Sequence, residues 1–188
     1  MKLFVGLEIP SPVRKAIVER TERIRSSLPH ASWVAPDDYH LLLAFLGDGE
    51  DGDLEGVGEA LSHAFASRES FEIQLAGAGS FPPRRPARVL WIGVEQKEAL
   101  ERLHRVVWDS LTRVMDIEPD WKPFHPHSTV ARCRKPWPRR CVDVWCRACS
   151  GRIGSPFRVH QGALFNSEPV RESPRYRVIE TFPMKGLH

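Results

Sequence analysis

Hydrophobic residues along the chain alternate between helical and strand spacing, which divides the chain into short elements. Helical spacing predicts helices over about 11–26, 53–67, 97–115 and 138–149. Apolar or alternating runs predict strands at 1–8, 39–47, 71–75, 88–94, 126–132, 157–165 and 176–182, with 31–34 leading into the second of them. Ser11 is expected to cap the first helix, with Pro12 in its first turn. Prolines exclude regular structure from 81–86 and predict an irregular, basic connection over 132–140.

The order of these elements predicts an α+β fold. Several neighbouring strands are joined by connections too short for a parallel crossover, so we expect them to pair antiparallel. A series of helix, strand, helix and strands occurs twice, which favours two similar lobes around a central cleft, each an antiparallel sheet with outer helices. With 188 residues, the chain is expected to form one bilobal domain over 1–188.

Two of the predicted strands each contain one histidine near their start. They read Tyr39-His40-Leu41-Leu42-Leu43-Ala44-Phe45-Leu46-Gly47 and Pro126-His127-Ser128-Thr129-Val130-Ala131-Arg132. Because strand side chains alternate between faces, His40 shares a face with Leu42, and His127 shares a face with Thr129. Two strands that present histidines to one cleft would supply an acid and a base.

Composition narrows the class of protein. With 41% hydrophobic and 27% charged residues, the chain has an ordinary globular composition. No run approaches the roughly 20 apolar residues of a membrane helix, and the first residues read as a strand rather than a signal peptide. We therefore expect a cytoplasmic protein with no membrane partner. We also expect a monomer. There is no phosphate loop of the GxxxxGK type, and we expect no cofactor.

Charge is unevenly distributed along the chain. Residues 36–60 contain eight acids and no Lys or Arg, whereas residues 121–152 contain eight Lys and Arg and only one acid, Asp143. This asymmetry suggests that the second segment meets an anion and that the first faces solvent. Two solvated faces that attract each other would give the same counts.

All four cysteines, Cys133, Cys141, Cys146 and Cys149, lie within seventeen residues. The CxxC spacing of Cys146 and Cys149, with His125 and His127 nearby, makes zinc an alternative to weigh. No second CxxC pair occurs, and a helix over 138–149 would use these cysteines as apolar contacts. Reduced, structural thiols with no metal are the favoured interpretation.

A pair of facing histidines suits the displacement of a phosphodiester. An imidazole gives or takes a proton near neutral pH, and each such role accelerates a reaction by about 10²–10⁴-fold. We expect His40 and His127 to be the catalytic pair. Thr129 would donate to a phosphate oxygen, and Arg132 would neutralise phosphate charge in the transition state. This chemistry needs no metal. His125, although on the same face as His127, is expected at the rim.

The two histidine strands stand in a familiar order with other short segments: Leu3-Phe4-Val5, Trp33-Val34, Phe81-Pro82, Ala87–Gly93, Leu164–Ser167 and Tyr176. Together they resemble the two-histidine phosphoesterases, specifically the RNA 2′,3′-cyclic phosphodiesterases, also named 2′-5′ RNA ligases. The resemblance implies a bilobal α+β fold with a pseudo-twofold cleft and hydrolysis of RNA 2′,3′-cyclic phosphate ends to a 2′-phosphate. It also implies weak, ATP-independent 2′-5′ ligation. In that scheme His40 protonates the departing 3′ oxygen and His127 activates water.

One position departs from the family pattern, which is His-x-Thr-x in both strands. The first copy reads His40-Leu41-Leu42-Leu43, so Leu42 stands where a phosphate-binding hydroxyl belongs. A hydrogen bond to a charged group contributes about 1.5–3 kcal/mol. Its loss would lower turnover by about 10- to 100-fold, which predicts a weakened or substrate-shifted enzyme.

Two other classes of function stay open. One is a non-catalytic protein that binds RNA ends or nucleotides in the same cleft, and the other is a zinc protein that uses Cys146 and Cys149. For RNA ends or small cyclic nucleotides as substrates, the basic segment and the arginines of 82–88 would contact the backbone. Trp137 and Phe165 are candidates to stack a terminal base, although partly buried core is the favoured interpretation of each.

Overall fold

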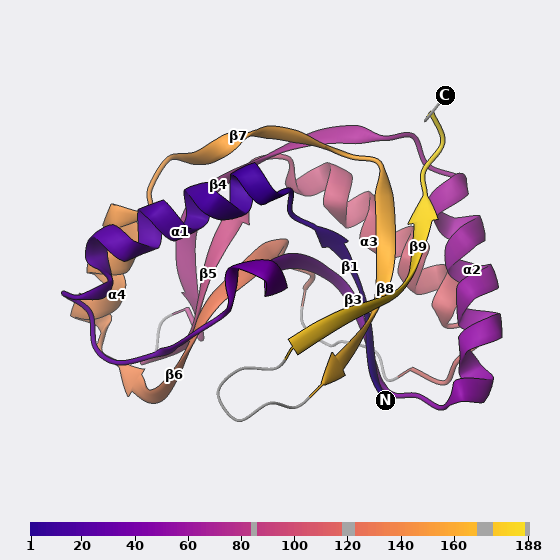
Figure 1. Cartoon of the computed structure of the whole chain (residues 1–188), viewed down its shortest axis with the longest axis horizontal. Helices are drawn as coiled ribbons and strands as arrows, with labels where there is room; N and C mark the ends of the chain where they lie inside the picture. The colour runs from indigo at the N-terminus through magenta and orange to yellow at the C-terminus, as the bar shows by residue number, and fades with distance from the viewer. Residues whose placement is uncertain (84–85, 118–122, 169–174, 187–188) are drawn as a thin grey trace.

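The computed structural model describes residues 1–83, 86–117, 123–168 and 175–186 (Figure 1). Within these ranges the helices are α1 (Ser11–Arg25), α2 (Leu54–Ala66), α3 (Lys97–Leu111) and α4 (Arg139–Ala148), with 3₁₀ turns η1 (Pro36–Asp38) and η2 (Asp51–Asp53). The strands are β1 (Lys2–Glu8), β2 (Ser32–Trp33), β3 (His40–Asp48), β4 (Phe71–Phe81), β5 (Ala87–Val94), β6 (His127–Trp137), β7 (Arg152–Val159), β8 (Gln161–Glu168) and β9 (Arg175–Pro183).

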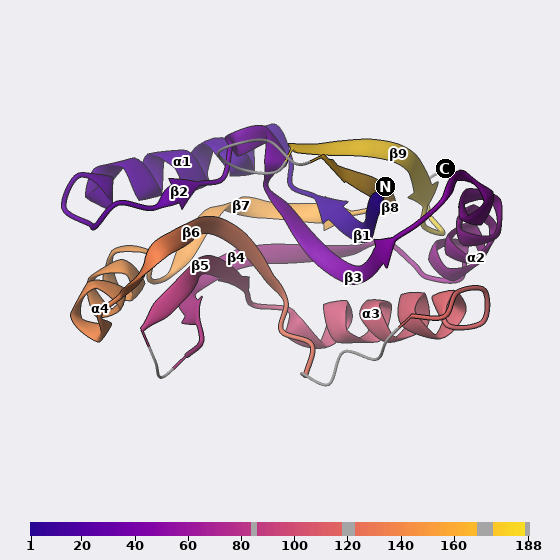
Figure 2. The ribbon, with the colours of Figure 1, turned by 90° about the horizontal axis from the view of Figure 1, so that it is seen from below.

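The described strands form two antiparallel sheets, of order β3-β1-β8-β9 and β2-β6-β5-β4-β7. Each sheet contains one of the histidine strands, β3 or β6. These two strands contact each other and lie near the middle of the molecule, while α2 and α4 lie at opposite ends (Figures 1 and 2). The predicted α+β fold with antiparallel sheets is therefore confirmed.

β3 and β6 share the same departure from regular alternation. Leu43 is an extra residue of β3 relative to β1, and Val130 is an extra residue of β6 relative to β5. Such a bulge leaves two successive side chains on one face. From each histidine onward, seven residues therefore show the same order of half-buried, buried, half-buried, buried, buried, exposed and buried positions. As a result, exposed Phe45 lies on the same face of β3 as His40, and exposed Arg132 lies on the same face of β6 as His127.

The core lies on the sheet faces that point away from the histidines. One stripe of each neighbouring helix packs against these faces. Helix α3 buries the residues predicted from its helical spacing: Leu100, Leu103, Val107 and Leu111. Burying a leucine or valine side chain contributes about 1.5–3 kcal/mol, so this stripe holds α3 firmly against its neighbours, α2 and β3. No helix within the described residues is long and apolar enough to cross a bilayer.

The segment 132–140 is less irregular than its composition predicts, because β6 continues to Trp137. Pro136 is tolerated there because the pairing of β6 with β5 is irregular between Val89 and Ala87. Prolines occur in strands at such breaks, where the missing N–H removes no regular ladder bond. The basic residues of this segment are therefore held on a strand.

Two helix ends also differ from the prediction. Ser11 does not cap α1, since Pro10 occupies the N-cap position and no side chain bonds there. Helix α3 ends at Leu111 rather than Met115, because the N–H groups of both Val114 and Met115 donate to the Leu111 carbonyl and turn the chain. Neither change alters the strands that carry the candidate site.

Candidate active site

His40 is held at the start of β3 by the backbone just before it. Its Nδ1 atom lies 2.8 Å from the carbonyl oxygen of Asp38. The half-buried ring packs against aromatic neighbours on the same face of its sheet, 4.8 Å from Phe4 and 4.7 Å from Tyr176 between centroids. The hydrogen bond therefore fixes Nδ1, and the aromatic neighbours restrict the orientation of the ring.

His127 is held in the same way at the start of β6. Its Nδ1 atom lies 2.6 Å from the carbonyl oxygen of His125, again two residues earlier. Phe81 contacts the ring edge to face at 5.0 Å, and Trp91 lies 6.0 Å away. The two histidines thus have equivalent positions, hydrogen bonds and aromatic surroundings in the two sheets.

These hydrogen bonds determine the tautomer of both rings. A carbonyl oxygen only accepts, so Nδ1 must be the protonated nitrogen in the neutral form of His40 and of His127. Nε2 then carries a lone pair and can accept a proton. After protonation, the Nε2–H group can donate a proton. Each ring can therefore act as a base or as an acid.

Burial makes the charged form of both histidines unfavourable. The pKa of His40 is lowered to about 4, chiefly by burial, and the charges of His127 and Arg132 act in the same direction against the bonding and charge of Asp38. The pKa of His127 is also lowered, again chiefly by burial, with opposition from its bond to the His125 carbonyl. Both rings are therefore neutral at pH 7 in the free protein. A phosphate anion beside them would favour protonation.

The other predicted site residues lie on the same two strands. Thr129 is half-buried two residues after His127, and Arg132 is exposed five residues after it. The equivalent positions of β3 hold Leu42 and Phe45. One histidine strand therefore offers a hydroxyl and a guanidinium, whereas the other offers two hydrocarbon side chains.

Asp38 joins the loop before His40 to the last strand. Its buried carboxylate accepts from the backbone N–H of Tyr176 at 3.1 Å and from the Arg175 guanidinium at 3.5 Å. The same residue accepts from His40 through its carbonyl. Asp38 therefore fixes both His40 and the strand that brings Tyr176 against it.

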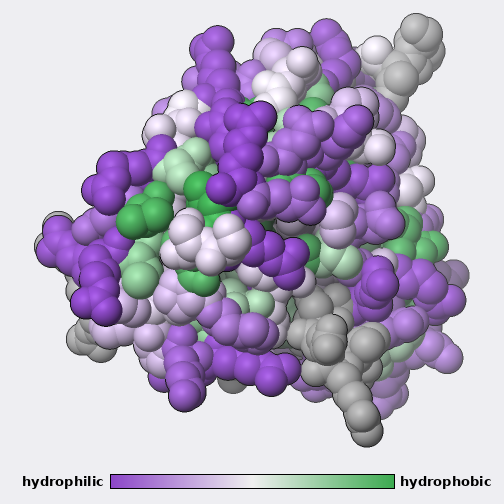
Figure 3. Space-filling model, turned by 60° about the vertical axis from the view of Figure 1, so that its left-hand side comes forward, coloured by the Kyte–Doolittle hydropathy of each residue, from purple (hydrophilic) through white to green (hydrophobic). Residues whose placement is uncertain are grey.

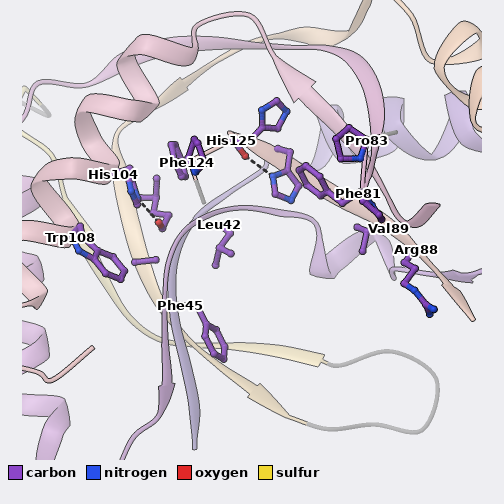
Figure 4. Close-up of a pocket in the computed structure, with 15 residues that line it drawn as sticks. Leu42, Phe45, Phe81, Pro83, Arg88, Val89, His104, Trp108, Phe124 and His125 are labelled. Carbon is purple, nitrogen blue, oxygen red and sulfur yellow. Dashed lines mark hydrogen bonds between the residues drawn. The ribbon is translucent and has the colours of Figure 1, made fainter. Parts of the chain in front are cut away.

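A cavity of about 690 Å³ opens between the two histidine strands and α3 (Figure 4). It is lined by Leu42, Leu43, Ala44, Phe45, Phe81, Pro82, Pro83, Arg88, Val89, His104, Trp108, Pro123, Phe124, His125 and His127. The lining thus reaches His127, whereas His40 is not among these residues. His125, expected at the rim, lines the cavity, and its Nε2 atom is buried with no hydrogen-bond partner among the described residues.

His104 is a residue of this cavity that the sequence analysis did not select. Its Nδ1 atom lies 2.7 Å from the carbonyl oxygen of Leu43, the bulged residue of β3. Its ring stacks on Phe124 at 4.1 Å and 2°. The available signal was its spacing of four residues from Trp108, beside the buried stripe of α3.

The two residues suggested for stacking a base do not have free ring faces. Trp137 is 1% exposed and Phe165 is 5% exposed. Phe165 stacks on Phe4 at 4.8 Å beneath His40. The favoured interpretation of both residues as core is therefore confirmed, since their rings complete the packing around the site.

The cysteines are four free thiols. Burial raises the pKa of Cys133 to about 11 and that of Cys149 to about 12, and the pKa of Cys146 is also raised. Within the described residues, no group of three or more His, Cys, Asp or Glu side chains is placed to hold a metal ion.

Gly47, Gly49 and Gly52 have the GxGxxG spacing of a dinucleotide-binding loop, between β3 and α2. That loop works in a parallel βαβ unit, where its N–H groups approach a pyrophosphate. Here β3 pairs antiparallel, and the three residues between the glycines are acidic. This segment therefore does not provide a phosphate site.

Exposed cations follow β6 and α4: Arg132, Arg134, Lys135, Arg139, Arg140 and Arg147. Within the described ranges none of them forms an ion pair, and the acidic segment 36–60 pairs only with Arg14 and Arg175. The acidic and basic segments therefore do not neutralise each other. Figure 3 brings the α4 end forward and shows a largely hydrophilic face. Of the predicted basic loop, Arg84 and Arg85 lie outside the described residues.

The protein is of a class in which two antiparallel sheets each contribute one histidine strand to a shared site. Residues 10–167 match the 2′-5′ RNA ligase superfamily, and the chain belongs to that family. An RNA 2′,3′-cyclic phosphodiesterase of Thermus thermophilus is 33% identical over 100% of this chain and 92% of its own length. One from Geobacillus stearothermophilus is 31% identical over 97% of this chain, which spans 57% of that protein. A crystal structure of a protein from Thermus thermophilus superposes with a TM-score of 0.84, at 29% identity over 100% of both chains.

Proposed function

We propose that this protein hydrolyses the 2′,3′-cyclic phosphate of RNA ends to a 2′-phosphate, with His40 and His127 as acid and base. The observation that carries the proposal is the equivalent hydrogen bonding of the two rings. Each Nδ1 atom bonds the carbonyl two residues earlier, which leaves each Nε2 atom for proton transfer. The curated relatives named for this activity support it.

The reaction proposed has one displacement at phosphorus. Nε2 of His127 takes a proton from water as the water oxygen bonds to phosphorus. The bond between phosphorus and the 3′ oxygen breaks, and Nε2–H of His40 gives its proton to that oxygen. The product has a 2′-phosphate and a 3′ hydroxyl, and the two imidazoles exchange their protonation states. The two rings carry both proton transfers, so the scheme uses no metal.

Charge on the phosphate explains how a buried histidine would act as the acid. His40 has a pKa of about 4 in the free protein. A bound phosphodiester anion would stabilise its imidazolium and raise the pKa toward neutrality. Thr129 would donate to a non-bridging oxygen, and Arg132 would offset the negative charge that develops in the transition state.

Leu42 would make the phosphate site unequal. With no hydroxyl on β3, the phosphate would have one side-chain ligand fewer than the repeated family motif supplies. The missing bond would lower turnover by about 10- to 100-fold. Because the hydroxyl is missing at Leu42, the second candidate function is binding of RNA ends without turnover.

The proposed substrate is an RNA end or a small cyclic nucleotide. The unpaired cations of β6 and α4 favour contact with a phosphate backbone. We also propose a weak second reaction without ATP, in which a 5′ hydroxyl rather than water attacks the cyclic phosphate. The bond between phosphorus and the 3′ oxygen breaks, and a 2′-5′ linkage forms. A monomer suffices for this scheme, since both histidines belong to one chain.

The experiment is hydrolysis of an RNA oligonucleotide that ends in a 2′,3′-cyclic phosphate, in the presence of EDTA. Phosphorus NMR identifies the product. A 2′-phosphate supports the proposal, whereas a 3′-phosphate would reverse the assignment of the leaving oxygen. Binding without turnover would favour the second candidate function.

A further inference from the structure

The two histidine strands differ in chemistry at equivalent positions. Two and five residues after its histidine, β6 has Thr129 and Arg132, whereas β3 has Leu42 and Phe45. A hydroxyl and a guanidinium suit a phosphate, and two hydrocarbon side chains do not. The β3 half of the site is therefore built for a different part of the substrate.

Phe45 is unusual for its exposure. It is 53% exposed, the highest value among the exposed large hydrophobic residues of the described ranges, and the others are aliphatic. An exposed phenyl ring in the lining of a cavity offers a face to a ligand. In Figure 4 it lies on β3 below Leu42, on the same strand that leads to His40.

The part of the cavity lining formed by α3 and the segment before His125 is also aromatic, and contacts hold its rings in place. His104 and Phe124 stack at 4.1 Å, and Trp108 lies 6.0 Å from His104. The hydrogen bond from His104 to the Leu43 carbonyl joins this wall to β3. Rings fixed in this way stack a flat ligand with little loss of side-chain entropy.

The size and position of the cavity suit one part of a nucleotide. The cavity volume of about 690 Å³ lies within the range of about 300–1,000 Å³ of small-molecule sites. The lining includes His127, so a ligand part in this cavity is a neighbour of the phosphate beside which His127 would activate water. In a nucleotide that neighbour is the ribose with its base, and aromatic rings bind bases of any sequence by stacking.

We propose that the aromatic cavity walled by Phe45, Trp108 and the His104–Phe124 stack binds the nucleobase of the RNA's terminal nucleotide, with Leu42 as part of its apolar lining. This inference rests on the proposed function, because it places the base relative to His127. Leu42 then replaces a phosphate contact with a base contact. The affinity of this enzyme for its substrate therefore depends more on the base than the affinity of a relative with a threonine in both histidine strands would.

The test compares adenosine 2′,3′-cyclic phosphate with methyl riboside 2′,3′-cyclic phosphate, which has a methoxy group in place of the base. Stacking on one aromatic ring changes affinity by roughly 5- to 150-fold, so kcat/KM is expected to favour the adenosine substrate by at least about that lower factor. Phe45→Ala and Trp108→Ala are expected to reduce this ratio. Val114→Ala, which changes an exposed apolar residue outside the cavity lining, should leave the ratio as it is.

A binding measurement separates this inference from the proposed function. Calorimetric titration compares adenosine 2′-monophosphate with methyl riboside 2-phosphate, and melting temperatures confirm that the variants are folded. Tighter binding of the adenosine compound that Phe45→Ala weakens supports the base site, even if neither cyclic phosphate is hydrolysed and the proposed function fails. Equal binding of the two compounds, or a base preference that neither variant reduces, would overturn it.

Discussion

The side-chain Oδ1 atom of Asp38 accepts a hydrogen bond from the backbone N–H of Tyr176 at 3.1 Å, across 138 residues of sequence. The Tyr176 ring then meets His40 edge to face at 4.7 Å. His40 is in turn bonded to the carbonyl of Asp38 itself. A single buried residue therefore links the candidate acid, through its backbone carbonyl, to the strand that closes the sheet, through its carboxylate.

Replacing Asp38 tests this link. Asp38→Ala leaves the Tyr176 N–H without its partner, and we expect a loss of about 1–3 kcal/mol in the free energy of unfolding. Asp38→Asn retains Oδ1 and loses only the charge opposite Arg175, whose side chain is 59% exposed, so its effect should be about 0–1 kcal/mol. Urea unfolding measures both. Equal destabilisation by the two variants would show that the charge, not the hydrogen bond, matters.

The buried state of His40 predicts a dependence of stability on pH. Its pKa is about 4 in the folded protein and about 6.5 in an unfolded chain. Between these values the unfolded chain binds more protons, so this histidine favours folding increasingly as pH rises from 4 to 6.5. The contribution is fully present above pH 6.5 and is lost as pH falls to 4.

His40→Asn removes this contribution. The free energy of unfolding of the native protein relative to the variant should increase by up to about 3 kcal/mol between pH 4 and pH 7. Urea unfolding at several pH values measures it, and His63→Asn, which changes an exposed histidine on α2, controls for loss of an imidazole. A constant difference between native protein and His40→Asn across that range would contradict the burial of the neutral ring.

Leu42→Thr should restore a phosphate ligand. We expect kcat/KM on a base-free cyclic phosphate to rise by about 10- to 100-fold, because a hydrogen bond to the charged transition state is gained. Leu42→Val is the matched control, since valine has the shape of threonine without its hydroxyl. If the threonine variant gains nothing over the valine variant, then residue 42 does not face the phosphate.

Thr129 is expected to supply the hydroxyl that the first strand lacks. Thr129→Val should lower kcat by about 10- to 100-fold, while Thr129→Ser should keep most of the activity because it keeps the hydroxyl. Steady-state kinetics on adenosine 2′,3′-cyclic phosphate distinguish these outcomes. A serine variant as impaired as the valine variant would indicate a packing role instead.

Much of the scaffold could be predicted from spacing. Alternation placed His40 with Leu42 and His127 with Thr129, and helical periodicity found the buried stripe of α3. These features follow from local geometry, which one stretch of sequence determines. The α+β class followed from the order of the elements and from short connections.

The bulges at Leu43 and Val130 could not be predicted, because an apolar run contains no mark of where one extra residue enters a strand. The exposure of Phe45 depends on the bulge at Leu43, because regular alternation would place Phe45 on the buried face of Leu41. His104 and Phe124 meet only in three dimensions. The aromatic cavity is therefore a property of the tertiary structure, whereas the histidine pair is visible in the sequence.

The central claim is that His40 and His127 act together as acid and base, and single and double substitutions measure it most directly. Hydrolysis of adenosine 2′,3′-cyclic phosphate in EDTA should fall by about 10²–10⁴-fold in His40→Ala and in His127→Ala. Turnover by the double variant should be only slightly below that of the less active single variant, because the effects of residues that act as a unit are not additive. A single variant that retains near-native turnover, or losses that simply multiply in the double variant, would contradict the account.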